Sequence, residues 1–533
     1  MATPDGAGDR ASSPAEWLFR HAARTPRAEA LDAPGTRLAY SAVAERVAVL
    51  AGDLATRGAG PADRVVVALP FSPAAAIATL AVQAIGACAV EIDPRTTART
   101  LASILSQTRP RFAIVHARDA ATWAEACSDD RRLEWAWATG PRLSDGAFPA
   151  RGTTPLGPAC EPAVPARPIA GPAPVTAGAP ALVVYTSGST RAPHGVVQTY
   201  GNVETNTRAI VSFLGLSAAD RAMALLPFHY CYGKSVLQTH LFVGASLFVE
   251  PRFMYPRIAI AALGTEECTG LAGVPLTFEL LRREVDVRSF SHPALRYVTQ
   301  AGGRMHATTL TWARAAFAPA RLYVMYGQTE ATARLAFLPP ERAADKEGSV
   351  GIAVPDVELR VVDDAGRERP AGELGQLVAR GPSVTPGYLD APEETAAILH
   401  DGWLWTGDLA RRDADGFLFL AGRAREILKV GGYRVVPDEI EEALAAHPAV
   451  ADAAVVGAPD DLEGEVAVAF VELRPGASAT ERDLRSHCLQ VLGRVKVPTR
   501  VVAVDALPRS AAGKPLKPVL RERARELMSA LAG

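Results

Sequence analysis

Short apolar runs alternate with longer apolar or amphipathic stretches along the first part of the chain. Runs of strand length, rich in β-branched residues, are separated by segments with helical spacing. Strands that alternate with helices over such distances predict βαβ units and parallel sheets. The predicted strands are Arg64–Leu69, Ala89–Ile92, Phe112–Val115, Ala181–Tyr185, Ala222–Leu226, Ala245–Val249 and Leu322–Met325, and the predicted helices are Ala74–Ile85 and Thr97–Gln107.

The pattern changes at about Arg423, where shorter elements follow one another closely. They are predicted as strands Ile427–Val430, Val450–Val456 and Val466–Leu473 and helices Asp438–Ala446 and Glu481–Leu492. This stretch has the size of an ordinary domain, and a chain of 533 residues is too long for a single core. We therefore predict an α/β fold in which residues 14–422 form a large N-terminal region of βαβ sheets with a β-rich subregion near its end, and residues 423–533 form a small α+β domain.

Two segments fall outside this pattern. Residues 1–13 are polar and rich in Gly and Asp, so they lack the apolar core of a signal peptide and are predicted to be a short disordered leader. Residues 158–180 are rich in Pro and Gly, which predicts an irregular connection on the surface.

Composition narrows the function. The 56 Lys and Arg residues nearly balance 58 Asp and Glu residues and are scattered among them, so we expect neither nucleic acid nor a membrane as a partner. The six cysteines form no CxxC pair and have no zinc-like spacing to histidine, which favours a reducing, cytoplasmic location. No apolar run reaches the roughly 20 residues that span a bilayer. We expect a monomer or homodimer.

The segment most informative about chemistry is Leu182–Val197, in which a strand runs directly into hydroxyl side chains and a glycine. Hydroxyls and backbone N–H groups of such a loop can surround phosphate oxygens. It is not a Walker loop, because the spacing GxxxxGK[ST] is absent. An ordinary Ser/Gly-rich turn is the alternative interpretation. The candidate phosphate-binding residues are Thr186, Ser187, Gly188, Ser189 and Thr190.

Five motifs in register give the chain a resemblance to a known superfamily. They are TSGST at 186–190, YGQTE at 326–330, WTGDLA at 405–410, GRAREILKVGGYRVVPDEIE at 422–441 and LPRSAAGK at 507–514. In this order they resemble the motifs of the adenylate-forming enzymes, which include acyl- and aryl-CoA synthetases, peptide-synthetase adenylation domains and luciferase. The resemblance covers nearly the whole chain and implies ATP, Mg²⁺ and coenzyme A as cofactor or co-substrates.

The resemblance implies a nucleotide site whose residues have suitable chemistry. Tyr326 offers a flat ring to adenine, and Gly302 and Gly303 permit a close backbone approach. Thr329 can donate to the α-phosphate, and Glu330 offers Mg²⁺ a hard oxygen ligand. The remaining implied residues are Gly327 and Gln328 of the same motif, and Asp408 and Arg423 at the ribose.

The resemblance also implies a mobile C-terminal domain that serves two half-reactions. Lys514 matches a lysine that bridges the carboxylate and the α-phosphate, where a cation stabilises the transition state. Rotation about a hinge at Arg425 would withdraw it and bring Lys429 to the adenylate. Gly431 and Gly432 would then line a channel for the thiol, with a tight turn as the alternative interpretation.

Two features depart from the family pattern. Its phosphate loop continues as Thr-Gly-x-Pro-Lys-Gly, whereas here Arg191 replaces the glycine and His194 replaces the lysine. Histidine is a weaker phosphate partner near neutral pH, since it is mostly neutral there. We predict that Arg191, which keeps its charge and can bind phosphate oxygens in a bidentate fashion, takes over this role.

The second departure concerns the acyl pocket. Relatives that activate α-amino acids carry an aspartate in the segment that matches LLPFHYCYG, but here His229 and Tyr230 stand at that place. An α-ammonium group would lack a counter-charge. Gly302 also lines the implied pocket, and Lys234 could meet a polar substituent. Aromatic residues Phe228, Tyr230 and Tyr232 favour an apolar or aromatic acid, with core packing as the alternative interpretation.

The function predicted from the sequence is ATP-dependent conversion of a carboxylic acid to its acyl-adenylate, followed by transfer to coenzyme A. Three alternatives stay open: a carrier-protein thiol as acceptor, an amine as acceptor, and a non-catalytic binder that arose through the changes at Arg191 and His194.

Overall fold

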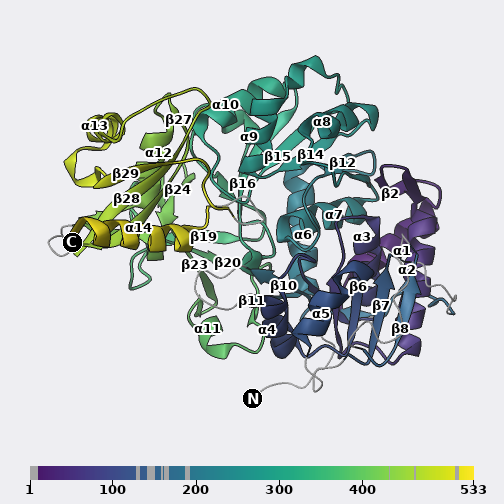
Figure 1. Cartoon of the computed structure of the whole chain (residues 1–533). Helices are drawn as coiled ribbons and strands as arrows, with labels where there is room; N and C mark the ends of the chain where they lie inside the picture. The colour runs from purple at the N-terminus through teal and green to yellow at the C-terminus, as the bar shows by residue number, and fades with distance from the viewer. Residues whose placement is uncertain are drawn as a thin grey trace.

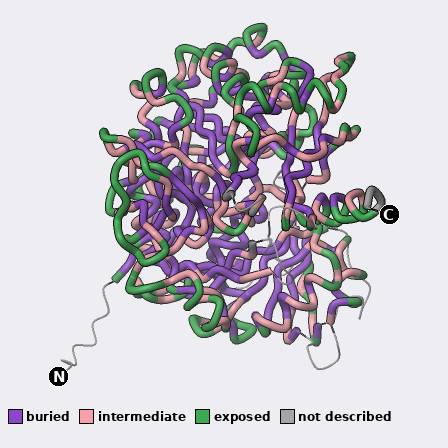
Figure 2. The backbone as a smooth tube through the Cα atoms, turned by 90° about the vertical axis from the view of Figure 1, so that its left-hand side faces the viewer, coloured by how far each residue is buried: buried purple, intermediate pink, exposed green. Residues whose placement is uncertain are grey.

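The computed structural model describes residues 10–127, 133–140, 150–157, 160, 167–186, 193–430, 433–460, 464–509 and 515–532. Most of the chain forms a large α/β region, and the last part forms a smaller domain beside it, at the left in Figure 1. Buried residues concentrate in the interior of the molecule, and exposed residues lie at its periphery (Figure 2). The predicted fold class is therefore confirmed.

Two large sheets build the N-terminal region. In the first, the inner strands run parallel, and β10 forms an antiparallel hairpin with β11 across the predicted phosphate loop. The order of this eight-stranded sheet is β21 (Gly387–Tyr388), β11 (His194–Thr199), β10 (Pro180–Thr186), β5 (Cys88–Glu91), β4 (Arg64–Ala68), β6 (Phe112–His116), β7 (Trp135–Thr139), β8 (Thr153–Leu156).

The second sheet is parallel at its centre and antiparallel at both edges. Its order is β18 (Ile352–Ala353), β17 (Ala336–Leu338), β16 (Arg321–Tyr326), β15 (Tyr297–Gln300), β14 (Gly270–Gly273), β12 (Arg221–Ala224), β13 (Ser246–Val249), β2 (Glu29–Ala33), β3 (Thr36–Ala39).

Helices cover the faces of both sheets, because the crossovers of parallel strands place them there. One continuous core joins the two sheets through α2, α3 and α7. Further cores lie under α4 and α5, under α8 to α10, and under α6. These helices are α1 (Pro14–Arg24), α2 (Tyr40–Thr56), α3 (Pro73–Ala84), α4 (Ala98–Thr108), α5 (Ala120–Ala126), α6 (Tyr200–Leu214), α7 (Cys231–Val243), α8 (Pro256–Thr265), α9 (Pro275–Glu284) and α10 (Ala307–Ala316).

A smaller sheet with its own core follows and is the predicted β-rich subregion. It consists of β19 (Glu358–Val362), β20 (Gly375–Arg380), β23 (Trp403–Arg412), β22 (Leu399–His400) and β24 (Leu418–Arg423), with the short helix α11 (Pro392–Ala396) beside it. The predicted boundary at residue 423 falls at the end of β24.

The C-terminal domain has helices on both faces of one sheet, with α12 and α13 on one side and α14 on the other. Its strands are β26 (Tyr433–Val435), β25 (Leu428–Val430), β28 (Gly464–Leu473), β27 (Val450–Asp460) and β29 (Arg500–Val504), and its helices are α12 (Pro437–Ala445), α13 (Glu481–Leu492) and α14 (Lys517–Ala532).

The prediction of a disordered leader over residues 1–13 is wrong for its described part. Arg10–Ala11 form strand β1, which pairs with β9 (Val175–Thr176) of the segment predicted to be irregular. The Ser13 side chain accepts a hydrogen bond from the Glu16 N–H and caps α1. Trp17 in the first turn of α1 is buried, which anchors the start of this helix in the core.

Candidate active site

The predicted site residues collect at the carboxyl ends of neighbouring parallel strands, which is where open α/β sheets bind ligands. Gly302 and Gly303 follow β15, and Tyr326 ends β16. Tyr230 and His229 follow β12 and precede α7. Because β12, β14, β15 and β16 are neighbours in one sheet, these segments converge at one edge.

A tyrosine, a carboxylate and a guanidinium form the part predicted to hold the nucleoside. The Tyr326 hydroxyl donates to Asp408 Oδ2 at 2.5 Å, and Arg423 Nε lies 2.8 Å from Asp408 Oδ1. Asp408 and Arg423 face each other across β23 and β24. Burial and the nearby Asp408 carboxylate raise the pKa of Tyr326 well above its usual value, so its hydroxyl stays protonated and keeps this bond. Each carboxylate oxygen has a further lone pair, so Asp408 could still accept from ribose hydroxyls.

The segment after β16 needs a glycine. A Cβ on Gly327 would lie 2.0 Å from the carbonyl oxygen of Ala333, so no other residue fits without moving the backbone. Gln328 precedes the short 3₁₀ helix η4 (Thr329–Ala331), and its carbonyl accepts from the Ala331 N–H at 3.0 Å. The Thr329 carbonyl accepts from Gln198 Nε2 of β11 at 3.0 Å, which ties the segment to the strand after the phosphate loop.

Glu330 lies beside the end of the predicted phosphate loop. Its Oε1 accepts from the Tyr388 hydroxyl at 2.8 Å, and the Tyr388 ring lies 5.1 Å from the ring of His194, the first residue of β11. Mg²⁺ at nucleotide sites is held by one or two carboxylates together with substrate phosphates. Glu330 fits this chemistry.

Tyr230 and Gly302 form the described wall of the predicted acyl pocket. Gly302 has φ +87°, and a Cβ there would lie 2.5 Å from the Tyr230 hydroxyl, so only glycine allows the backbone and this hydroxyl to approach each other. Gly303 packs near Pro275 at the start of α9. His229 Nε2 lies 3.7 Å from Asp93 Oδ2, and burial lowers the pKa of this histidine.

Lys234 does not face an open pocket. Its Nζ donates to Glu91 Oε1 of β5 at 2.6 Å and to Thr79 Oγ1 of α3 at 3.3 Å, and both members of the ion pair are buried. Lys234 thus joins α7 to the first sheet, and its charge is already matched by Glu91. Phe228 and Tyr232 are likewise buried in core clusters.

We expect Lys234→Ala to lower the free energy of unfolding by about 3–5 kcal/mol, because it leaves Glu91 buried without its partner. Thermal unfolding measures this. The order of preferred acids should not change in Lys234→Ala, whereas it should change in Tyr230→Ala, which opens the pocket wall. An acid profile altered by Lys234→Ala alone would contradict this assignment.

Polar contacts join the C-terminal domain to the loop between β15 and α10. Arg304 pairs with Glu442 of α12 at 2.7 Å, and His306 lies 3.4 Å from Asp452 of β27. Arg425 lies exposed in the 3₁₀ helix η6 (Ala424–Glu426), between β24 and β25, at the predicted hinge.

Several predicted residues fall outside this description. The structure describes the backbone of Thr186 at the end of β10 and of Lys429 in β25, but not their side chains. Outside the described residues lie Ser187, Gly188, Ser189, Thr190, Arg191, Gly431, Gly432 and Lys514.

Sequence reasoning missed Arg334. This arginine follows the YGQTE motif by four residues, is buried, and lines a small cavity behind Tyr232. A lone Arg in the apolar run RLAFL was the available signal, since an arginine is rarely buried without a partner.

Comparison with known proteins identifies the family. The model of the AMP-binding enzyme family matches residues 18–389, and that of the AMP-binding enzyme C-terminal domain matches residues 439–514. The chain belongs to the AMP-binding enzyme family. This confirms the resemblance inferred from the motifs.

Curated relatives of this AMP-binding enzyme are CoA ligases. A 2-succinylbenzoate–CoA ligase from Geobacillus kaustophilus is 34% identical over 341 residues, which cover 64% of this chain and 69% of the relative. A sulfoacetate–CoA ligase from Cupriavidus necator is 33% identical over 498 residues, which cover 90% of this chain and 91% of the relative.

Solved structures of similar proteins share the fold along nearly the whole chain. The o-succinylbenzoate CoA synthetase MenE from Bacillus subtilis, in complex with ATP and magnesium, has a TM-score of 0.81 at 25% identity and covers 94% of this chain and 98% of its own. The amide bond synthetase McbA from Marinactinospora thermotolerans has a TM-score of 0.83 at 27% identity and covers 96% of this chain and 100% of its own. Among the described residues, no helix is long and apolar enough to cross a membrane.

Proposed function

We propose that this enzyme activates a carboxylic acid with ATP and Mg²⁺ as an acyl-adenylate and transfers the acyl group to coenzyme A. The observation that carries the proposal is the convergence of three separate segments: Gly302 after β15 and Tyr326 to Glu330 after β16 lie at the carboxyl ends of neighbouring strands, and Asp408 on β23 of the smaller sheet is bonded to Tyr326. Family membership and the CoA ligases among its relatives support the reaction class.

The first half-reaction joins two anions. A carboxylate oxygen of the acid attacks the α-phosphorus of ATP, the bond to the β-phosphate oxygen breaks, and pyrophosphate leaves. Thr329 and the hydroxyl loop after Thr186 would hold the phosphates, and Glu330 would hold Mg²⁺. Lys514 would stabilise the charge on the reacting oxygens.

In the second half-reaction, the thiol sulfur attacks the acyl carbon, the thiol proton is lost, and AMP leaves with the carboxylate-derived oxygen. The proposed withdrawal of Lys514 and approach of Lys429 would free the face of the adenylate that the thiol reaches. The hinge of this rotation would be Arg425 in η6.

We propose an acid with an apolar or aromatic body and no α-amino group. Tyr230 presents an aromatic ring beside Gly302 at the described pocket wall, and the charge of Lys234 is taken by Glu91. The named acids of both relatives, 2-succinylbenzoate and sulfoacetate, carry a second acidic group besides the carboxylate that is activated.

An amine is the second candidate acceptor, because the amide bond synthetase McbA shares the fold at 27% identity. A carrier-protein thiol is the third. All of them use the same first step, so acid activation is tested apart from acyl transfer.

The experiment is ATP–pyrophosphate exchange with a panel of acids, followed by acceptor assays with coenzyme A, a phosphopantetheinylated carrier protein and amines. We expect acid-dependent exchange and a thioester with coenzyme A. If exchange depends on the acid but product forms only with amines, the acceptor is an amine and not coenzyme A. If none of the acids supports exchange, catalysis is refuted and the protein is a binding protein.

Replacing Gly432 by leucine should separate the half-reactions. We expect thioester formation to fall at least about tenfold, because the side chain would fill the proposed thiol channel, while pyrophosphate exchange stays within about twofold. Gly60→Leu is the control, since a Cβ at Gly60 meets nothing within 4 Å. Equal loss of both activities in Gly432→Leu would mean that this glycine only shapes the turn.

A further inference from the structure

Few of the described arginine and lysine side chains are buried, and one of these has no described acidic partner. Arg221, Lys234 and Arg334 are the arginine and lysine residues that are buried in the described part of the chain. Arg221 contacts Glu29, Asp32 and Glu266, and Lys234 contacts Glu91. No described carboxylate lies within ion-pair distance of Arg334, which is 3% exposed.

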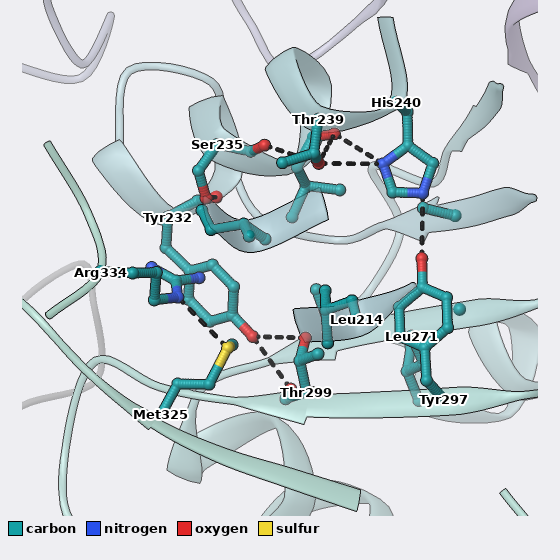
Figure 3. A pocket seen from close by; sticks show the side chains of 15 residues that line it. Leu214, Tyr232, Ser235, Thr239, His240, Leu271, Tyr297, Thr299, Met325 and Arg334 are labelled. Carbon is teal, nitrogen blue, oxygen red and sulfur yellow. Dashed lines mark hydrogen bonds between the residues drawn. The ribbon is translucent and has the colours of Figure 1, made fainter. Parts of the chain in front are cut away.

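The contacts of Arg334 are weak for a charged group. Nη1 donates to the carbonyl oxygen of Ala333 at 3.1 Å, and Nε points to Met325 Sδ at 3.4 Å. The guanidinium lies over the Tyr232 ring, 4.0 Å from its centroid (Figure 3). A guanidinium has five N–H donors and does not lose its charge in proteins. Most of its hydrogen-bonding capacity is therefore not met by these contacts.

An unpaired buried charge is unfavourable, and a charged ligand bound beside it would supply the missing partner. A guanidinium binds the planar oxygens of a carboxylate, or the oxygens of a sulfonate, through paired hydrogen bonds. Arg334 thus has the chemistry of an anion-binding group.

Its position is beside the proposed acyl pocket. The backbone before Arg334 packs on Gly327, and the N–H after it, of Leu335, donates to the Tyr326 carbonyl at 2.9 Å. Tyr232, which the guanidinium covers, lies 6.4 Å from Tyr230 between ring centroids. The positive charge of Arg334 also opposes the rise that burial causes in the pKa of Tyr230.

Behind Tyr232 a cavity of about 20 Å³ separates α6 and α7 from the sheet. This volume holds about one water molecule. On its far side His240 Nε2 is bonded to the Tyr297 hydroxyl at 2.9 Å, and the Tyr232 hydroxyl is bonded to the Thr299 carbonyl at 2.9 Å (Figure 3). These bonds close the space beyond Arg334, so a long chain cannot continue past it.

We propose that Arg334 binds a second anionic group of the acid, so that the substrate is a compact carboxylic acid with a distal carboxylate or sulfonate. This inference rests on the proposed acid activation and adds the class of acid. The sequence analysis expected Lys234 to contact a polar substituent of the acid, and we now propose Arg334 for this role.

The test compares acids that differ only in the second anionic group: succinate with butyrate, sulfoacetate with propionate, and phthalate with benzoate. In at least one pair, we expect the dianionic acid to have a kcat/KM for pyrophosphate exchange at least about 30-fold above that of its partner. Arg334→Met should lower kcat/KM for that dianion by about 100-fold and leave the monoanion within about threefold. Arg334→Lys should retain part of the preference.

Arg221→Met is the matched control, since it removes another buried arginine: it should lower thermal stability without changing the ratio between the two acids. A wild-type preference for the monoanion in every pair would overturn the inference, and this result does not depend on whether Arg334→Met folds. Equal losses for both acids in a folded Arg334→Met would also overturn it. If none of the acids supports pyrophosphate exchange, the proposed function itself is refuted.

Discussion

Replacing Lys514 by alanine is expected to lower the rate of acyl-adenylate formation by about 100-fold or more, because it removes a positive charge from the transition state. The LPRSAAGK motif leads into α14, whose first residue, Lys517, is bound to Glu426 at 2.8 Å and Glu441 at 2.9 Å. Glu426 belongs to η6, so the start of α14, three residues after Lys514, is tied to the proposed hinge. Pyrophosphate exchange with the preferred acid measures the effect.

The control is Lys496→Ala, which removes another lysine of the same domain that pairs with Glu439. It should leave exchange within about twofold, as expected for a partly exposed ion pair. Exchange by Lys514→Ala within a few-fold of the parent enzyme, with unchanged thermal unfolding, would show that another group supplies the charge.

Asp408→Ala is expected to lower kcat/KM for ATP by about 100-fold, because hydrogen bonds from a ligand to a charged group contribute about 1.5–3 kcal/mol each and Asp408 could accept two from the ribose. The substitution also removes the partner of the Tyr326 hydroxyl and of Arg423. Steady-state kinetics with ATP varied at saturating acid measures the loss.

Asp220→Ala provides the comparison, since Asp220 is another buried aspartate paired with an arginine, Arg296, at 2.8 Å. It should lower thermal stability and leave kcat/KM for ATP within about threefold. If both variants change ATP kinetics equally, Asp408 acts through stability and not through the nucleotide.

The order of strands and helices could be predicted because it follows from hydrophobic periodicity. Predicted strand Phe112–Val115 is β6 (Phe112–His116), and predicted helix Glu481–Leu492 is α13 with the same bounds. Residues 10–13 were wrongly predicted as part of a disordered leader because their order depends on a distant partner: Arg10 of β1 pairs with Thr176 of β9, 166 residues further along the chain. Local composition does not contain such a contact.

Candidate site residues could be named from the sequence where a motif contains them, but the partner of a buried side chain could not. Tyr326, Glu330 and Asp408 could be named because their motifs stand in register along the chain. The partner of Lys234 could not be predicted, because Glu91 lies at the end of β5 in the first large sheet, far from Lys234 in the sequence. Arg334 was missed for the same reason, because only the packed structure shows that no described carboxylate reaches it.

The most direct test of acid activation follows an oxygen atom. The preferred acid, labelled with ¹⁸O in its carboxylate, is incubated with the enzyme, ATP, Mg²⁺ and coenzyme A, and the nucleotide product is analysed by mass spectrometry. Attack of the carboxylate on the α-phosphorus and later cleavage of the acyl C–O bond predict AMP that carries one labelled oxygen. Unlabelled AMP, or ADP with the label in inorganic phosphate, would contradict an acyl-adenylate.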